Sequence, residues 1–270
     1  MALDQEWMAD QSTETPSGAR MYDYYLGGHH NFEVDRRGAE RVAAVYPEVF
    51  ISSQANRALL RRMVGFLASQ GVDQFLDIGS GIPAFGNVHE VAMAVNPNAR
   101  TVYVDIDGVA VAHGQAVLKA VPQAAMIQGD VRQIEEIFAH PEVQRLLDFT
   151  RPVAVLLLAL LHFVPDEHEV EHIVSTIRET IPAGSYFVIT NGTTEGVPSD
   201  LTAQIEQLYS QFAQPVKFRS AAEIRKLFAG LEIVEPGIVY GPLWHPEAST
   251  DLFLDEPSRS LVYGGIGRKP

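Results

Sequence analysis

Acidic residues and glycines stand at the ends of three short apolar stretches of this chain. Asp77 lies near the end of the first stretch and leads into Gly79 and Gly81, and Asp105 and Asp130 follow the next two. A strand that turns into a glycine loop lets the backbone approach a ligand closely. If the stretches form parallel strands, their carboxyl ends meet at the edge of the sheet where such folds bind ligands. The spacing therefore predicts a ligand site with three carboxylates, although each aspartate alone is more typical of a turn.

The glycine loop is compatible with two kinds of nucleotide ligand. Gly79, Gly81 and Ala84 fit the pattern G-x-G-x-x-A, which is typical of dinucleotide binding after a strand. Asp77 argues against a dinucleotide, because a carboxylate just before the first glycine would repel the pyrophosphate. The same carboxylate suits the ammonium and sulfonium groups of S-adenosylmethionine through charge-assisted hydrogen bonds. We therefore favour a methyl donor over nicotinamide or flavin.

Each strand end has an expected contact with this ligand. Asp105 lies at the distance from the loop at which an acidic side chain accepts hydrogen bonds from ribose hydroxyls, and Asp107 competes for that role. Asp130 is placed to accept from the adenine amino group, while the backbone of Val131 bonds a ring nitrogen. The expected cofactor contacts are Asp77, Ile78, Gly79, Ser80, Gly81, Asp105, Ile106, Asp107, Gly129, Asp130 and Val131.

A fourth apolar stretch ends in LLALLHFVPD and holds the main candidate for catalysis. Ala159 and Leu160 are expected beside the cofactor, and His162 is the polar residue there. As a general base His162 would take a proton from an oxygen or nitrogen acceptor, a step worth about 10²–10⁴-fold. Alternatively it packs under the cofactor or hydrogen-bonds the backbone, and the two roles are equally compatible with the sequence. Direct displacement also proceeds by positioning alone.

The segment ARMYDYYLGGHHNFEVDR combines tyrosines with a Gly-Gly break. Tyr22 and Tyr24 are expected on a hinged cover that places aromatic faces over the cationic sulfonium, although such a density of aromatic residues is more typical of plain core. Asn31 and Arg36 are expected either to reach the cofactor or to clasp the cover to the main domain. The two adjacent histidines point in different directions, so we predict no metal site.

Later residues are candidates for contacts with the acceptor. Tyr209, Trp244 and the loop at 242–253 are expected to determine its specificity, because insertions around late strands carry it in α/β folds. Together with Tyr24 and His162 they form the predicted acceptor site. Trp244 is equally compatible with a core position.

The elements that position these residues follow from the hydrophobic pattern. Short apolar strands alternate with amphipathic helices, which is typical of a parallel sheet covered on both faces. We expect a doubly wound α/β sheet of about seven strands, mostly parallel, with an antiparallel end formed by residues 231–240 and 260–267. A helix capped by Ser52 or Ser53 and ended by Gly71 precedes the sheet.

Composition divides the chain into three regions. Residues 1–18 are polar and acidic, and we expect a disordered or loosely ordered tail there. Residues 19–50 form the helical cover, and residues 51–270 form the Rossmann-like domain.

Charge and composition exclude several functions. The formal net charge of −14 repels phosphate backbones and anionic lipids, so we expect neither a nucleic-acid nor a membrane partner. The chain has no cysteine, which excludes thiolate catalysis and is compatible with the cytoplasm. Arg57, Arg61 and Arg62 form a basic cluster, which we interpret as the solvated face of a helix. Monomer and homodimer are equally open.

These motifs together resemble a known class of enzyme. The stretches LDIGSG, VDID and QGDVR and the late strands are similar to class I S-adenosylmethionine-dependent methyltransferases over about residues 52–267. The stretches ARMYDYYLGGHHNFEVDR, NRALLRR and LLALLHFVPD resemble an actinobacterial S-adenosyl methyltransferase family first catalogued as a domain of unknown function. The class resemblance implies a strand order that reverses beside the first strand. It also implies that the methionine part, the ribose and the adenine are held respectively by Asp77 with Gly79 and Gly81, by Asp105, and by Asp130 with Val131.

The favoured hypothesis is an enzyme that moves a methyl group from S-adenosylmethionine to a small-molecule oxygen or nitrogen acceptor, leaving S-adenosylhomocysteine. A non-catalytic sensor or partner protein that binds S-adenosylmethionine is the alternative, because no decisive acid–base pair is evident. A dinucleotide-dependent oxidoreductase is less favoured.

Overall fold

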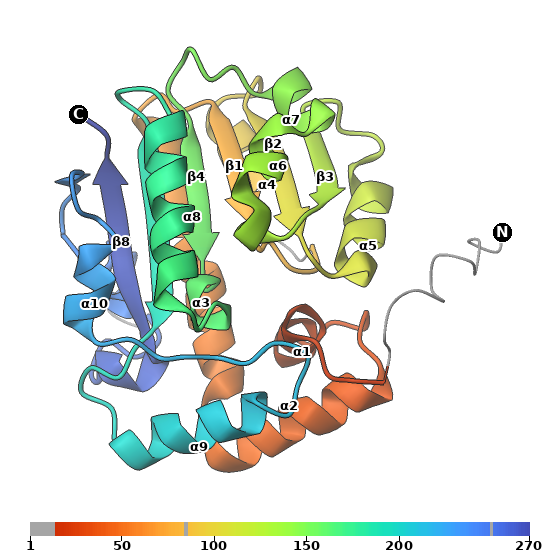
Figure 1. The fold of residues 1–270 in the computed structure, drawn as a ribbon, viewed down its shortest axis with the longest axis vertical. Helices are drawn as coiled ribbons and strands as arrows, with labels where there is room; N and C mark the ends of the chain where they lie inside the picture. Colours follow the sequence, from red (N-terminus) through yellow and green to blue (C-terminus); the bar gives the residue numbers. More distant parts are fainter. Residues whose placement is uncertain (1–13, 84–85, 249–250) are drawn as a thin grey trace, which may run out of the picture.

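The computed structural model describes residues 14–83, 86–248 and 251–270. Within them the chain folds around one sheet of eight strands, in the order β3-β2-β1-β4-β5-β8-β6 with β7 paired to β8 (Figure 1). The parallel strands are β1 (Gln74–Ile78), β2 (Arg100–Asp105), β3 (Ala124–Gln128), β4 (Ala154–Leu158) and β5 (Tyr186–Gly192). Antiparallel pairing adds β8 (Val262–Arg268), β6 (Glu232–Ile233) and β7 (Val239–Tyr240). The predicted doubly wound α/β fold with an antiparallel end is confirmed.

The centre of the sheet is buried on both faces, which explains its continuous apolar runs. Every residue of β1 and of β4 is buried, as expected for parallel strands covered by helices on both sides. β1 pairs with β2 on one side and with β4 on the other. The strand order therefore reverses beside β1, and a crevice at the carboxyl ends is expected at that point.

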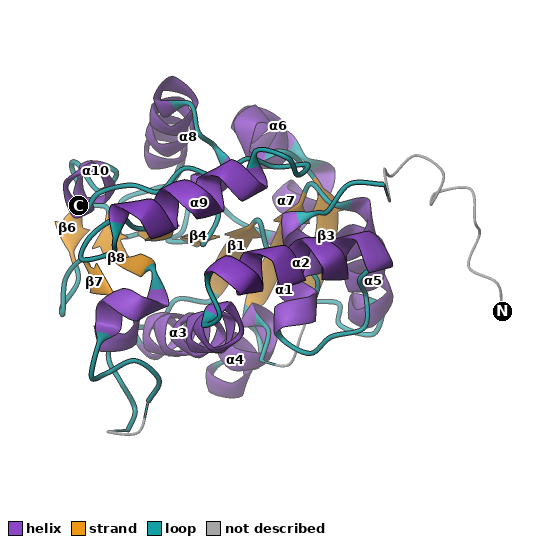
Figure 2. Cartoon of the chain, turned by 90° about the horizontal axis from the view of Figure 1, so that it is seen from below, coloured by secondary structure: helices purple, strands orange, loops and turns teal. Residues whose placement is uncertain are grey.

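Helices form a layer on each face of the sheet (Figure 2). One layer contains α3 (Val49–Ser69), α4 (Val88–Val95) and α5 (Gly108–Leu118). The other contains α6 (Ile134–Ala139), α7 (Pro141–Leu146), α8 (Glu167–Thr180) and α10 (Ala221–Lys226). Alternate residues of one strand enter opposite layers: Leu76 packs in the second and Phe75 in the first, as the two-residue period of a strand requires.

A cover of three helices crosses the carboxyl ends of the parallel strands (Figures 1 and 2). It consists of α1 (Gly18–Tyr25), α2 (Glu33–Val45) and α9 (Ser199–Tyr209). α9 lies beside α2, and a small apolar cluster that includes Met21, Val42 and Phe212 joins this cover internally. We predicted the helical cover at 19–50, whereas the contribution of α9 comes from the distant part of the chain.

Two details of the helix before the sheet differ from expectation. The helix α3 begins at Val49, so neither Ser52 nor Ser53 is its cap. Both serines are buried inside the helix, where the Ser52 hydroxyl donates to the carbonyl oxygen of Ser260 at 2.6 Å. Gly71 does follow the helix, with φ of +86°, which is the left-handed conformation that suits glycine.

The arginines of α3 do not form a solvated face, in contrast to our interpretation. Arg57 and Arg62 are buried, and Arg61 is exposed. Arg62 donates to the carbonyl oxygens of Trp244 and Gly241 at 2.9 and 3.0 Å. These long-range bonds fix the late loop to α3, which no helical pattern reveals.

The tail that we placed at 1–18 is in part outside the described residues, which begin at residue 14. Within the described part, Ser17 is 3% exposed, so this residue packs against the domain rather than hanging loosely from it. No helix within the described ranges is both long and apolar enough to cross a membrane.

Candidate functional site

A cavity of about 500 Å³ lies between the carboxyl ends of the parallel strands and the cover. The predicted cofactor residues of the strand ends all line it: Asp77, Ile78, Gly79, Ser80, Gly81, Asp105, Ile106, Asp107, Gly129, Asp130, Val131, Ala159 and Leu160. Tyr22, His162 and Tyr209 line it as well. The parallel register brings these residues to one edge although they are far apart in the chain.

The loop after β1 has glycine at two positions whose backbone conformation is left-handed. Gly79 and Gly81 have φ of +73° and +69°, a region that costs an L-residue about 1–2 kcal/mol. A Cβ atom on Gly79 would lie 2.5 Å from Cδ1 of Leu160, whereas one on Gly81 would meet no described atom within 4 Å. The loop thus leaves open space at Gly81 at the cavity wall. Ala84, the third residue of the dinucleotide pattern, lies outside the described residues.

Alanine substitutions at these glycines are expected to separate stability from binding. Gly79→Ala should lower the free energy of unfolding by more than the strain of about 1–2 kcal/mol, because Leu160 must also move. Gly81→Ala should lower the free energy of unfolding of the free protein only by this strain. It should in addition lower the affinity for S-adenosylhomocysteine. Urea unfolding and calorimetric titration measure the two quantities.

Gly71→Ala is the matched control for these variants. Gly71 has φ of +86° and open space around it but stands at the end of α3, so it should lose stability without losing affinity. A Gly81→Ala variant that binds as tightly as Gly71→Ala would contradict a close approach of the ligand to this loop.

Asp77 and Asp105 are carboxylates buried at the bottom of the cavity, with 4% and 6% of each residue exposed. Burial raises the pKa of Asp77 to about 7; the nearby Arg57 lowers it and Asp105 raises it. Burial likewise raises the pKa of Asp105 to about 6, opposed by hydrogen bonds from the backbone of Asp107 and of Gly81. Two destabilised anions side by side are a strong indication of a site that awaits a cationic or hydrogen-bond-donating ligand.

The affinity for a ligand with an ammonium group is expected to fall as the pH falls below about 7. Binding needs the ionised carboxylates, and the free site takes up protons as the pH passes the pKa values of about 7 and about 6. One linked proton changes the affinity about tenfold per pH unit. Calorimetry of S-adenosylhomocysteine in buffers of different ionisation enthalpy should show proton release near pH 6.5.

The raised pKa values of Asp77 and Asp105 affect the stability of the free protein in the opposite direction: its free energy of unfolding falls as the pH rises, whereas the affinity for the ligand increases. A carboxyl whose folded pKa is raised stabilises the fold below its unfolded value of about 4, and this contribution is lost as the pH rises through the folded value. The stabilisation that S-adenosylhomocysteine gives should therefore be larger at pH 8 than at pH 6. Equal thermal shifts at both pH values would contradict ionised carboxylates as its partners.

Asp107 and Asp130 play different parts at the next two strand ends. The Asp107 carboxylate caps α5 by accepting from the amides of Val109 and Ala110 at 2.9 and 3.2 Å, and its other oxygen accepts from Ser17 and Arg20. Asp105 accepts from two backbone amides, one at each oxygen, so its carboxylate is less fully engaged by the protein. Asp130 pairs with the guanidinium of Arg132 at the rim of the cavity. These contacts favour Asp105 over Asp107 as the predicted ribose partner.

Two polar residues of α3 that we did not predict as part of the site, Asn56 and Arg57, line the same cavity as Asp77. Arg57 reaches the cavity from α3 and donates to the carbonyl oxygen of Gly86 at 3.2 Å. Asn56 donates from Nδ2 to the hydroxyl of Tyr22 at 3.1 Å, while its buried Oδ1 has no hydrogen-bond partner among the described residues. The Tyr22 hydroxyl in turn donates to the carbonyl oxygen of Ser53 at 3.1 Å. The helical spacing of apolar residues assigns each position of α3 either to the core or to the solvent-exposed surface, and it gives no sign that some positions line a cavity.

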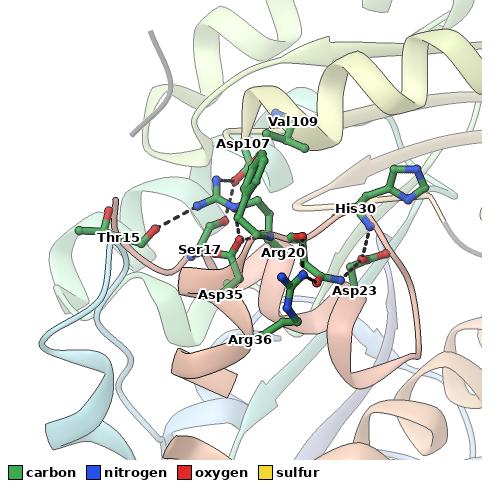
Figure 3. Close-up of polar contacts among 12 residues, drawn as sticks. Thr15, Ser17, Arg20, Asp23, His30, Asp35, Arg36, Asp107 and Val109 are labelled. Atoms are coloured by element: carbon green, nitrogen blue, oxygen red, sulfur yellow. Dashed lines mark hydrogen bonds and ion pairs between the residues drawn. The ribbon is translucent and has the colours of Figure 1, made fainter. Parts of the chain in front are cut away.

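An ion-pair network clamps the cover onto the strand ends (Figure 3). Arg20 donates from Nε to Asp35 at 2.8 Å and from Nη1 to Asp107 at 2.9 Å, and all three side chains are at most 4% exposed. The hydroxyl of Ser17 donates to the same oxygen of Asp107 at 2.6 Å. The backbone amide of Asp107 donates to the carboxylate of Asp105 at 2.9 Å. Asp107 therefore connects this ion-pair network directly to Asp105, the predicted ribose contact.

His162 lines the cavity from the turn after β4, but its environment disfavours a role as a base. Burial and the charge of Arg219 lower the pKa of His162 to about 3. Its Nδ1 accepts a hydrogen bond from the amide of Gly192 at 3.4 Å. A neutral imidazole that accepts at Nδ1 carries its proton on Nε2. The geometry therefore favours a hydrogen-bond donor here.

The structure does not bring four predicted residues to this cavity, and each has another role. Asn31 donates to Asp23 and accepts from Arg36, within the cover itself. The Tyr24 hydroxyl donates to Glu40 on the surface. Trp244 is fully buried against Phe66, which is the core position that the sequence left open, and the described part of the loop at 242–253 lines the core and surface rather than the cavity.

A doubly wound sheet that reverses beside β1, with a glycine loop and successive carboxylates at its carboxyl edge, defines a Rossmann-like protein with a nucleotide-type cofactor site. The chain belongs to the S-adenosyl methyltransferase family, whose model matches residues 5–270. S-adenosylmethionine is accordingly the cofactor, and the dinucleotide interpretation of the glycine loop is not supported.

Solved structures show the same relationship. A protein from Thermobifida fusca described as a methyltransferase is 40% identical with a TM-score of 0.88, and the match covers 94% of this chain and 95% of that one. A DUF574 family protein from Streptomyces avermitilis is 37% identical with a TM-score of 0.90, over 96% and 99% of the two chains. Human N-acetylserotonin methyltransferase in complex with S-adenosylmethionine is 14% identical with a TM-score of 0.50, over 98% and 66%, and shares the fold. No curated protein matches this chain.

Proposed function

We propose that this protein transfers the methyl group of S-adenosylmethionine to an oxygen or nitrogen atom of a small-molecule acceptor. The observation that carries this proposal is that one cavity joins the glycine loop and its carboxylates to an apolar chamber under α2 and α9. When bound, S-adenosylmethionine supplies an electrophilic methyl carbon, whose bond to sulfur is replaced by a bond to the acceptor. The protein then has to hold both molecules in line and keep water away.

The residues around β1 fit the methionine part of the cofactor. Asp77, raised in pKa by burial, gains a partner in the ammonium group, and the unpartnered Oδ1 of Asn56 is a second acceptor for it. Arg57 lines the same wall and suits the carboxylate, since a guanidinium binds carboxylates in a planar fork. Both charges of the amino acid part thereby find an opposite charge.

The remaining parts of the cofactor follow the strand order. We assign the ribose hydroxyls to Asp105 and the adenine to Asp130 and the backbone of Val131, all of which line the cavity. Tyr22, fixed at its hydroxyl by Ser53 and Asn56, is the aromatic residue that we assign to the sulfonium, because an aromatic face attracts a cation. The formal net charge of −14 favours a small-molecule acceptor over a nucleic acid, and a chain without cysteine is suited to the reducing cytoplasm.

Calorimetry with S-adenosylmethionine and S-adenosylhomocysteine tests the cofactor half of this proposal. Both ligands are expected to bind, and a chromatographic assay for S-adenosylhomocysteine formed in the presence of acceptors tests the transfer. Failure of both ligands to bind would disprove the proposal. Binding without product from any acceptor would favour the sensor instead.

A further inference from the structure

The part of the cavity under the cover is built almost entirely of apolar and aromatic side chains. Tyr25 and Val42 come from α1 and α2, and Ile205 and Tyr209 come from α9. Phe218 closes it from the segment after α9. We call this part, defined by Tyr25, Val42, Ile205, Tyr209 and Phe218, the acceptor chamber. Aromatic walls of this kind suit a planar ring, which packs edge-to-face or offset against them.

None of the residues that line the cavity from α1, α2, α9 and the segment 213–218 is charged, and Gln214 is polar. The charged groups of the cavity lie on the strand ends, on α3 and at the start of α8 instead: Arg57, Asp77, Asp105, Asp107, Asp130, Arg132, Asp166 and Glu169. An ion placed in the chamber would lose its hydration without gaining a counter-charge, which costs several kcal/mol or more. The chamber therefore selects a neutral acceptor.

One polar group of the chamber lacks a well-placed partner. Tyr25 is 5% exposed, and its buried hydroxyl makes no hydrogen bond of good geometry within the described ranges, although the hydroxyl of Tyr209 is a close polar neighbour. Burial is the main cause that raises the pKa of Tyr25 well above its ordinary value, and the adjacent hydroxyl of Tyr209 raises it further. The Tyr25 hydroxyl thus stays protonated. A buried hydroxyl without a partner costs about 1–3 kcal/mol, and a ligand oxygen in the chamber would remove that cost.

His162 supplies a second donor at the border between chamber and strand ends. The Gly192 amide occupies Nδ1, which leaves the proton on Nε2. Arg219 is fully buried and donates to the carbonyl oxygens of Leu161 and Val164, each at 2.7 Å. Burial is the main cause that opposes an imidazolium at His162, and the positive charge of Arg219, which pairs with Glu167 at 3.2 Å, adds to it. His162 is accordingly a positioning residue rather than a base.

Resting on the proposed function, we propose that the acceptor is a neutral aromatic alcohol of phenol or naphthol type, oriented by hydrogen bonds from Tyr25 and His162. The phenol oxygen bonds to the methyl carbon as the carbon–sulfur bond breaks, the sulfur keeps that electron pair, and the phenol proton passes to water. A phenol ionises near pH 10, as tyrosine does. It loses its proton without the strong base that an aliphatic alcohol needs, which matches a site whose histidine is held neutral.

Calorimetric titration of the S-adenosylhomocysteine complex with 2-naphthol tests this acceptor class. 2-Naphthoate and 2-naphthylmethylammonium are the charged probes of similar shape, and we expect 2-naphthol to bind at least about tenfold more tightly than either. Tyr25→Phe should weaken 2-naphthol about threefold to tenfold, the value of one hydrogen bond. Tyr24→Phe is the matched control, because its hydroxyl lies on the surface beside Glu40.

The affinity for S-adenosylhomocysteine is measured first in every variant and shows that each is folded. If that ligand binds but 2-naphthol does not, or if a charged probe binds as tightly, the acceptor class is wrong and the cofactor assignment stands. Unchanged 2-naphthol affinity in Tyr25→Phe would likewise overturn the role of Tyr25. If S-adenosylhomocysteine itself does not bind, the proposed function fails.

Two substitutions of His162 distinguish a donor from a base. Glutamine keeps an N–H donor at the end of its side chain, and leucine keeps none. His162→Gln is therefore expected to retain more 2-naphthol affinity and more methyl transfer than His162→Leu. Equal loss in both variants, together with a wild-type rate that levels off above about pH 6.5 as a histidine base would require, would overturn the positioning role.

Discussion

Asp77→Asn is expected to lower the affinity for S-adenosylhomocysteine about 30-fold or more and to leave the free protein at least as stable as the wild type. Removing one partner of a buried charge pair costs about 2–5 kcal/mol, and 2 kcal/mol corresponds to about 30-fold. The free protein does not suffer, because burial raises the pKa of this carboxyl to about 7. The amide keeps the shape of the side chain without the cost of an unneutralised anion. Calorimetry and urea unfolding at pH 8 measure the two effects.

Asp73→Asn is the matched control, since Asp73 stands at the opposite end of β1. Its carboxylate accepts from Arg151 at 2.6 Å and is 24% exposed, so the loss should be at most about 1 kcal/mol of stability. The affinity for S-adenosylhomocysteine should not change. If Asp77→Asn binds like Asp73→Asn, the carboxylate has no part in binding the ligand. If instead the Asp77→Asn variant is less stable than the wild type, the Asp77 carboxylate stabilises the fold.

The sequence was sufficient to predict which strand-end residues line the cavity from the side of the sheet. Asp77, Asp105 and Asp130 stand at strand ends, and the alternation of strands and helices places such ends at one edge whatever the side chains around them. Positive φ values at Gly79 and Gly81 are likewise local properties of the loop. Both features are determined by residues close by in the sequence, so the local pattern of apolar residues and glycines is enough to predict them.

The cover side of the site was harder to predict, because its contacts join distant parts of the chain. Asn31 and Arg36 have the donors expected for a ligand, yet they bond each other. The sequence pattern predicts Arg57 on the surface of its helix, whereas in the structure it lines the cavity. Burial, and after it the charge of Arg219, lowers the pKa of His162, and Arg219 is held by carbonyl oxygens of the turn that carries His162. No pattern in sequence shows which buried group a side chain will face.

Arg20→Leu is expected to lower the free energy of unfolding by about 3–5 kcal/mol, because it leaves the carboxylates of Asp35 and Asp107 buried without their cation. The side chains of these two aspartates are 0% and 4% exposed. A loss of this size corresponds to a fall in melting temperature on the order of 10 °C for a chain of this length. The affinity for S-adenosylhomocysteine should fall as well, since the Asp107 amide holds Asp105 in place. Thermal unfolding and calorimetry measure the two effects.

The uncompensated charge can be separated from the lost packing by a second change. Replacing Asp35 and Asp107 with asparagine in the Arg20→Leu background removes both anions and keeps a capping oxygen for α5, so part of the stability should return. Arg37→Leu is the control in the same segment, because Arg37 pairs with Glu33 at 74% and 60% exposure and should cost less than about 1 kcal/mol. An Arg20→Leu variant no less stable than Arg37→Leu would show that the clamp does not hold the cover. A loss of stability without any loss of affinity would show that the cover folds independently of the ribose site.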